Sequence, residues 1–121
     1  MCEIRSYKDL LIWQKGIKIV TLVYQLVDSF PKDEIYALTS QIKRAAISVP
    51  SNIAEGFGRN ADKSFSYFLD VSRGSLYELE TQLIIARELG FIKNESSLIE
   101  ILNQIVEESK MINSFSKTLK S

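Results

Sequence analysis

The residues best suited to chemistry lie between Gln41 and Arg59, a stretch that reads QIKRAAISVPSNIAEGFGR. Offsets of three and four residues place its polar members on one face of a helix. These members are Arg44, Ser48, Ser51, Asn52, Glu55 and Arg59. Such a face can exchange hydrogen bonds, and its arginines can contact a phosphate or a carboxylate. The stretch is therefore a candidate binding surface.

The sequence shows no sign of catalytic or metal chemistry. It has no histidine, which is the commonest general base and metal ligand, and a single cysteine, Cys2. Glu55, Ser48 and Tyr77 could in principle react, but no nucleophile–base pair is recognisable among them. We therefore predict a protein that is not an enzyme and that uses no metal and no cofactor.

The polar face has two interpretations. Most charged stripes on helices simply face solvent. Ser, Asn and Pro are, however, poor helix formers, and a solvated face is more stably built from Glu, Lys and Gln. Small residues that would let another helix come close also flank the face: Ala45, Ala46, Ala54 and Gly56. These choices favour a packing or binding role.

We assign two sets of residues to this role. The first is a packing or oligomer motif: Ser48, Pro50, Ser51, Asn52, Glu55 and Gly56. The second contains basic residues that could contact nucleic acid: Lys43, Arg44 and Arg59. Glu55 and Arg59 also have the spacing of an ion pair within a helix. The Asn52 amide is a candidate donor for the carbonyl that Pro50 leaves without its usual N–H.

The elements that would position these residues are helices. The first helix carries two neighbouring apolar stripes: Leu10, Trp13, Ile17, Val20, Tyr24 and Val27 in one, and Ile12, Ile19, Val23, Leu26 and Phe30 in the other. An apolar surface this broad needs more cover than one neighbouring helix gives. The first helix is therefore central in the bundle or also buried against another subunit. We interpret the second stripe as the surplus stripe, the apolar surface that exceeds what the core of one subunit requires.

The second helix is predicted to run from about Asp33 to Phe57. Its apolar stripe keeps its phase past Pro50, which favours a kink at the proline over a break between two helices. The third helix has a glycine in its middle, Gly74, which is costly in a helix interior. A close approach of another helix would explain this glycine.

Capping residues mark the other helix ends. Asn60 is the predicted N-cap of the third helix. Gly90 suits the left-handed position after that helix, with Phe91 folding back onto Ala86 in a Schellman-type cap. Asn94 is the predicted cap of the fourth helix. The apolar stripe of that helix is Leu98, Ile101, Leu102, Ile105, Ile112, Phe115 and Leu119.

Together these segments predict an all-α protein, an antiparallel up-down-up-down four-helix bundle with a proline kink in the second helix. Residues 1–121 would form this single domain. No apolar run approaches the ~20 residues that span a bilayer, and a lone thiol fits a reducing compartment. We therefore expect a cytoplasmic protein with no membrane partner.

Charge limits the choice of partner. Lys plus Arg and Asp plus Glu each total 15, so the formal net charge is zero. Phosphate binding is driven by local positive charge and counterion release. A nucleic-acid site would therefore have to be a local patch of a few basic residues.

Three stretches carry a resemblance to a known family. They read DLLIWQK at 9–15, FPKDEIYALTSQIKRAAISVPSNIAEGFGR at 30–59 and FLDVSRGSLYELETQL at 68–83. The chain resembles the bacterial four-helix bundle family first associated with proteins encoded in intervening sequences of 23S rRNA genes. The most specific element is SNIAEG with the following Arg59.

The resemblance also implies an assembly and partners. The family is similar to the accessory protein of diversity-generating retroelements, a pentameric barrel of bundles that works with a reverse transcriptase and binds nucleic acid through a basic surface. A homo-pentamer without enzymatic activity is implied here. Those accessory proteins are basic and this chain is neutral, so only Lys43, Arg44 and Arg59 remain as basic candidates at motif positions.

Two hypotheses follow. In the first, the chain is a non-catalytic homo-oligomeric scaffold or interaction module, whose partners are copies of itself and another protein, with a reverse transcriptase as one candidate. In the second, it is an RNA- or DNA-binding accessory protein. A ring would then multiply the few basic residues of each copy into a usable patch.

Overall fold

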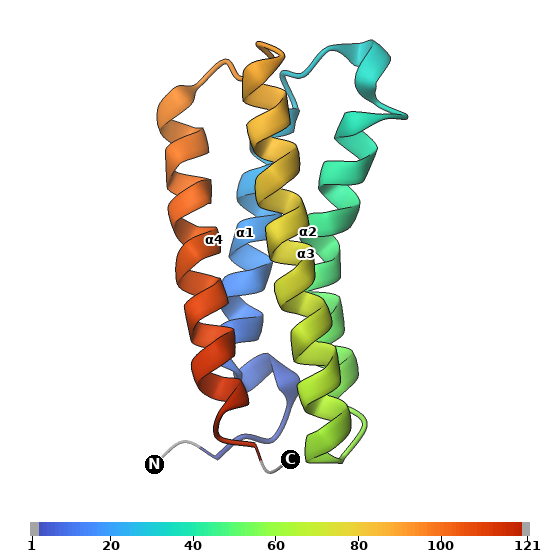
Figure 1. The fold of residues 1–121 in the computed structure, drawn as a ribbon, viewed down its shortest axis with the longest axis vertical. Helices are drawn as coiled ribbons and strands as arrows, with labels where there is room; N and C mark the ends of the chain where they lie inside the picture. The colour runs from blue at the N-terminus through green and yellow to red at the C-terminus, as the bar shows by residue number, and fades with distance from the viewer. Residues whose placement is uncertain (1–2, 120–121) are drawn as a thin grey trace.

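The computed structural model describes residues 3–119. In chain order, its elements are the 3₁₀ helix η1 (Tyr7–Asp9), α1 (Leu11–Val27), the 3₁₀ helix η2 (Lys32–Glu34), α2 (Leu38–Phe57), α3 (Asp62–Glu88) and α4 (Glu95–Ser116). Figure 1 shows the long helices side by side in an elongated bundle. Both α1 and α3 pack against α2 and α4, so the chain runs around the bundle in sequence order. The predicted all-α four-helix bundle is confirmed.

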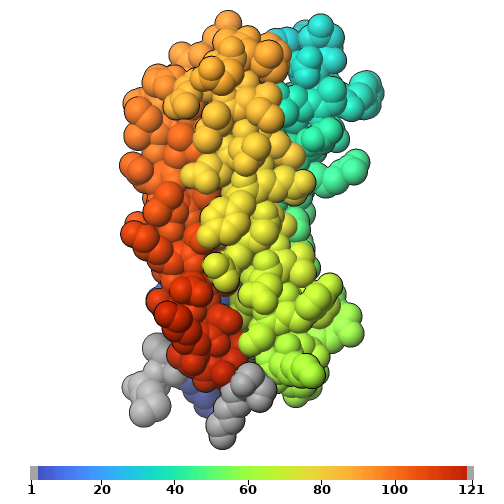
Figure 2. All heavy atoms as spheres, in the orientation of Figure 1, coloured from blue at the N-terminus to red at the C-terminus, as the bar shows by residue number. Residues whose placement is uncertain are grey.

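Apolar side chains from all four helices fill the interior. The larger side chains that are fully buried or nearly so are Ile19, Val23, Ile42, Val49, Ile53, Leu69, Leu76, Leu79, Leu83, Leu98, Ile101, Ile105 and Ile112. Each such side chain contributes about 1.5–3 kcal/mol when it leaves water, so this set dominates the favourable side of folding. In the space-filling view of Figure 2, α3 and α4 close over this core along the front face.

α1 turns the second of its two apolar stripes toward the core. Ile19 and Val23 of that stripe have no exposed surface, whereas Ile17 and Tyr24 of the other stripe are each 39% exposed. The expectation that the second stripe is the surplus one is therefore wrong, because periodicity shows that two stripes exist but not which of them faces inward. The surplus stripe of α1 consists of Trp13, Ile17, Val20 and Tyr24.

α2 begins later than the sequence predicts. A start near Asp33 is expected, but a 3₁₀ helix lies there and the α-helix begins at Leu38. Between the two, Ala37 has φ −122° and ψ −109°, which lies outside the helical region and separates them. α2 then runs without a break through Pro50 to Phe57. The proline therefore does not divide the helix, and the kink stays a prediction.

The end of α3 is the Schellman motif that the sequence predicts. The Phe91 N–H donates to the Ala86 carbonyl at 3.0 Å, and the Gly90 N–H donates to the Arg87 carbonyl at 3.0 Å. Gly90 has φ 79°, a left-handed conformation that a glycine adopts without steric cost. The Phe91 ring then packs against Phe30 with 5.8 Å between the centroids.

The N-caps of α3 and α4 differ from each other. Asn94 Oδ1 accepts the Ser97 N–H at 3.0 Å, so the predicted cap of α4 is confirmed. Asn60 does not cap α3, because the cap position belongs to Ala61 and Asn60 has φ 56°. Asn tolerates the left-handed region better than most side chains. Its role here is to turn the chain between α2 and α3.

Candidate functional site

Part of the polar face of α2, Ser48 and Asn52, is turned toward α3 of the same chain. Ser48 Oγ and Ser75 Oγ lie 2.8 Å apart, and Asn52 Nδ2 donates to Ser48 Oγ at 2.9 Å. One turn along, Ser72 Oγ donates to the Val49 carbonyl at 2.7 Å. Each such bond contributes about 1 kcal/mol net. The bonds Ser48–Ser75 and Ser72–Val49 join the two helices and fix how α2 and α3 align. These serines and Asn52 therefore have a packing role inside the subunit.

The Asn52 amide does not serve the expected carbonyl. Pro50 lacks the N–H that would meet the carbonyl of Ala46, four residues earlier. Asn52 Nδ2 instead donates to the Ser48 carbonyl at 2.8 Å. A side chain on a helix reaches back to the turn before it, which for Asn52 is Ser48, whereas Ala46 lies six residues away. The expectation for this amide is wrong.

Gly56 lies where α2 and α3 approach closely. A Cβ built on Gly56 would lie 2.8 Å from Phe68 Cβ and 2.9 Å from Phe65 Cδ1. Packed carbon atoms do not come so near to each other. Only a glycine fits between these two rings without a shift of one helix.

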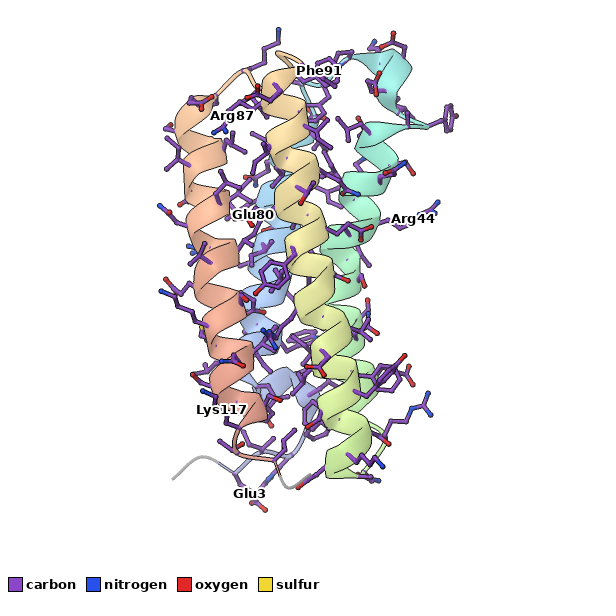
Figure 3. All side chains as sticks on the ribbon, in the orientation of Figure 1. Glu3, Arg44, Glu80, Arg87, Phe91 and Lys117 are labelled. Atoms are coloured by element: carbon purple, nitrogen blue, oxygen red, sulfur yellow. The ribbon has the colours of Figure 1, made fainter. Side chains whose placement is uncertain are left out.

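Two of the three basic candidates, Lys43 and Arg44, lie in α2, and Arg59 lies two residues beyond its end. Arg59 Nη2 lies 2.8 Å from Glu55 Oε2, which confirms the ion pair predicted from their spacing. Lys43 Nζ lies 4.7 Å from the centroid of the Tyr24 ring. Arg44 is exposed, has no partner within residues 3–119 and points away from the bundle in Figure 3. Arg44 and Arg59 are separated by about 20 Å of chain at the helical rise, so one subunit does not bring them together.

An apolar groove runs along the outer side of α1 and α2, and we call it the α1–α2 groove. It encloses about 300 Å³ and is lined by Tyr7, by Trp13, Ile17 and Val20 of the surplus stripe, and by Ile47, Pro50, Ser51 and Ala54 of α2. Ile47 is 42% exposed. The groove thus joins the surplus apolar surface of α1 to Pro50 and Ser51 of the predicted motif.

The opposite side of the bundle also exposes apolar side chains. Tyr77 of α3 is 52% exposed, and its hydroxyl accepts a hydrogen bond from Ser109 of α4 at 3.4 Å. Helical spacing places Ile84 on the Tyr77 side of α3, and Val106 and Ile99 beside Ser109 on α4. We call Tyr77, Ile84, Ile99 and Val106 the α3–α4 patch. Because the chain runs around the bundle in order, the patch lies opposite the α1–α2 groove.

Gly74 lies open on the surface of α3. No atom beyond its own stretch of helix lies within 4 Å of the position that its Cβ would occupy. The close helix approach expected at Gly74 is therefore absent within residues 3–119.

Comparison with known proteins identifies the family. The model of the 23S rRNA-intervening sequence protein family matches residues 8–114. The chain belongs to this family. Its fold is similar to a crystal structure of a protein of unknown function from the S23 ribosomal protein family of Bacteroides thetaiotaomicron VPI-5482, with a TM-score of 0.79 and 19% identity over 88% of this chain and 96% of that chain. No curated protein matches the chain.

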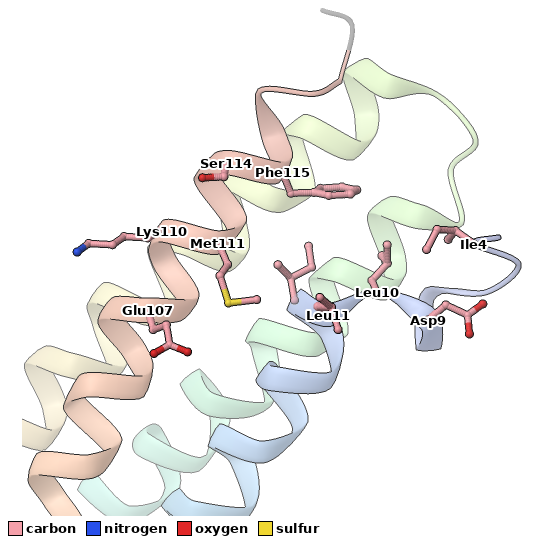
Figure 4. Close-up of a pocket in the computed structure, with 10 residues that line it drawn as sticks. Ile4, Asp9, Leu10, Leu11, Glu107, Lys110, Met111, Ser114 and Phe115 are labelled. Atoms are coloured by element: carbon pink, nitrogen blue, oxygen red, sulfur yellow. The ribbon is translucent and has the colours of Figure 1, made fainter. Parts of the chain in front are cut away.

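This member of the 23S rRNA-intervening sequence protein family also has a cavity that the sequence analysis did not identify. Figure 4 shows it between the start of α1 and the last turns of α4, with a volume of about 490 Å³. Its lining includes the apolar Leu10, Leu11, Met111 and Phe115 and the polar Asp9, Glu107, Lys110 and Ser114. The volume is in the range of small-molecule sites. The sequence signal that could have indicated it is the apolar run Leu10–Ile12, which is too broad for one buried face.

A carboxyl group lies in the core. Glu108 of α4 has no exposed surface, and neither of its carboxyl oxygens has a hydrogen-bond partner within residues 3–119. Burial raises the pKa of Glu108 to about 8, with Lys15 lowering it and Glu107 raising it by smaller amounts. The group is therefore mostly protonated at neutral pH. The sequence signal for this buried position is its place in the apolar stripe between Ile105 and Ile112.

The residues considered for metal binding and for catalysis can be located in the described part of this family member. Within residues 3–119, no three His, Cys, Asp or Glu side chains are grouped so that they could hold a metal ion. Glu55 pairs with Arg59 and Ser48 with Ser75, so neither serves the other as base or nucleophile. Cys2 lies outside the described residues. None of the described helices has the length and hydropathy needed to cross a membrane.

Proposed function

We propose that this protein is a non-catalytic homo-oligomeric scaffold, and the α1–α2 groove is the observation that supports this function. A subunit alone would leave the apolar side chains of the groove in water. Contiguous exposed apolar surface usually marks an interaction site. The groove also includes Pro50 and Ser51, so the motif residues that do not pack against α3 would contact the partner.

A second copy of the chain is the proposed partner, because each copy also carries the α3–α4 patch. The groove and the patch differ in residues and lie on opposite sides of the bundle. A contact between two different surfaces repeats from copy to copy and closes into a ring when the rotation allows it. Five subunits is the number that the family resemblance implies.

The first test is the mass of the purified protein in solution by light scattering. We expect a mass near five times the 13.8 kDa of one subunit. Ile17→Glu combined with Ile47→Glu puts two charges into the groove and should give monomers. Asn103→Glu, which adds a charge at an exposed position of α4 outside the groove and the patch, should leave the mass unchanged. A stable wild-type monomer would contradict the proposal.

A mixing experiment tests which surfaces meet. A patch variant, Ile84→Glu with Val106→Glu, should also be monomeric. When it is mixed with the groove variant, the intact groove of the one can bind the intact patch of the other, so a 1:1 dimer is expected. If the groove instead binds the groove of another copy and the patch binds another patch, each variant forms its own homodimer and no 1:1 heterodimer appears. A mixture that stays monomeric also contradicts the proposed contact.

One observation favours a second function, binding of RNA or DNA at Arg44. Arg44 is exposed and unpaired within residues 3–119, and it lines a polar hollow of about 380 Å³ with Gln41, Ser48, Glu78 and Gln82. Five copies on a ring would repeat the charge at regular spacing. The test is a mobility shift with structured RNA at low and moderate salt. Binding should be lost in Arg44→Ala combined with Arg59→Ala, and no shift at low salt excludes this function.

A further inference from the structure

Glu108 occupies a place in the core where an apolar side chain is expected. It lies between Ile105 and Ile112 at helical spacing, and none of its surface is exposed. Both carboxyl oxygens are without a hydrogen-bond partner in the described chain. An ionised carboxylate in such a place is strongly disfavoured, because no contact offsets the loss of its hydration.

Three helices meet at this carboxyl. A Cβ built on Gly16 of α1 would lie 3.4 Å from Glu108 Oε2, 3.3 Å from Pro50 Cβ and 3.4 Å from Pro50 Cδ. The carboxyl of α4 and the proline ring of α2 therefore face the same point on the backbone of α1. Both can come this near because Gly16 has no side chain.

No cation within residues 3–119 pairs with the carboxyl. Lys15, the neighbour of Gly16 on α1, has its Nζ 2.6 Å from both Gln104 Oε1 and Glu107 Oε1, so it is already engaged near the surface. Lys15 favours ionisation of Glu108 and Glu107 opposes it, but burial is the largest influence and the pKa is raised to about 8. The residue of α2 that faces Gly16 beside this carboxyl is Pro50, which carries no charge.

The neutral carboxyl also suits this layer of the bundle. Pro50 has no N–H, so the fully buried Ala46 lacks the usual helical donor for its carbonyl. Buried carbonyls are nearly always hydrogen-bonded in proteins. A protonated Glu108 brings one O–H donor to the layer of Pro50, where the proline removes one backbone donor, whereas an ionised carboxylate brings acceptors only.

We propose that Glu108 is a proton-operated latch: its neutral carboxyl holds α4 against Gly16 of α1 and Pro50 of α2, and loss of the proton opens this layer of the bundle. The latch is closed in neutral and acidic solution and opens in alkaline solution. It belongs to a single subunit, so it holds whether or not copies of the chain associate.

The test measures stability against pH where few other groups titrate. The chain has no histidine, so Glu108 is the main group whose proton differs between the folded and unfolded chain from about pH 5.5 to 7. The folded chain keeps this proton there, and the unfolded chain, with a carboxyl pKa near 4.5, does not. The equilibrium constant for unfolding in urea should therefore rise about tenfold per pH unit.

Two variants isolate the group. Glu108→Gln keeps the shape of the side chain and removes the titration, so its unfolding constant should be nearly independent of pH in the window. Glu107→Gln changes the exposed neighbour and should keep the wild-type rise. The latch is overturned if the wild-type constant does not change with pH, or if Glu108→Gln shows the same rise as the wild type.

A second measurement needs no variant and decides the matter if Glu108→Gln does not fold. Carboxyl ¹³C NMR on protein labelled at glutamate follows each titration in the folded state. One resonance should titrate near pH 8, well above the ordinary range of glutamate. Titration of every glutamate below about pH 5.5 overturns the latch.

Discussion

At the scale of single residues, two glycines in neighbouring helices should respond to alanine with opposite signs. Gly56→Ala places a Cβ 2.8 Å from Phe68 Cβ, which is fixed to its backbone and cannot give way. We expect a loss of about 1–3 kcal/mol in the free energy of unfolding. Gly74→Ala meets nothing within 4 Å, so better helix propensity should raise stability by up to about 1 kcal/mol. Urea unfolding of both variants checks the pair, and equal effects would contradict the packing described.

The residue types that matter could be predicted from the sequence, but the contacts they make could not. Ser48 and Asn52 were recognised because such residues are unfavourable inside a helix. The bond between Ser48 and Ser75 depends on how α3 lies against α2, which spacing along one helix does not contain. The burial of Glu108 is hard to predict, because two adjacent glutamates usually face solvent. Its spacing from Ile105 is nevertheless that of a core residue.

At the scale of the elements, the two asparagines before α3 and α4 make a second pair of predictions. Asn94→Ala removes the side-chain acceptor of the Ser97 N–H and should cost about 1 kcal/mol. Asn60→Gly should change stability by less than about 0.5 kcal/mol, because glycine adopts the left-handed φ of 56° without steric cost. Thermal unfolding of both variants measures this. A large loss in Asn60→Gly would show that Asn60 caps α3 after all.

The helix ends that the sequence predicted correctly are those whose signals are local. Gly90 and Phe91 form a cap within one turn, and so does Asn94. The sequence predicts the start of α2 too early, because Pro31 and Asp33 form a good start signal for any helix. The structure uses that signal for the short η2, and the break at Ala37 depends on backbone angles that the residue types do not indicate.

At the scale of the whole molecule, four periodic segments with short connections were enough to predict the bundle. They were not enough to predict which surface remains for a partner. α1 could place either apolar stripe inside, and the choice depends on how α2 and α4 pack around it. In the structure the surplus stripe of α1 lies beside α2, where Trp13 and Ile17 line the α1–α2 groove together with Pro50. The groove can therefore be identified only from the structure.

The latch and the groove share Pro50, so self-association should depend on pH. Pro50 lines the groove on one side and faces the Glu108 carboxyl across Gly16 on the other. If only the closed form associates, the subunit dissociation constant should rise about fivefold between pH 8 and 9, above the pKa of about 8. Sedimentation at several concentrations measures this constant, and Glu108→Gln should remove the dependence. A dissociation constant that rises equally in Glu108→Gln would assign the effect to other groups and would separate the groove from the latch.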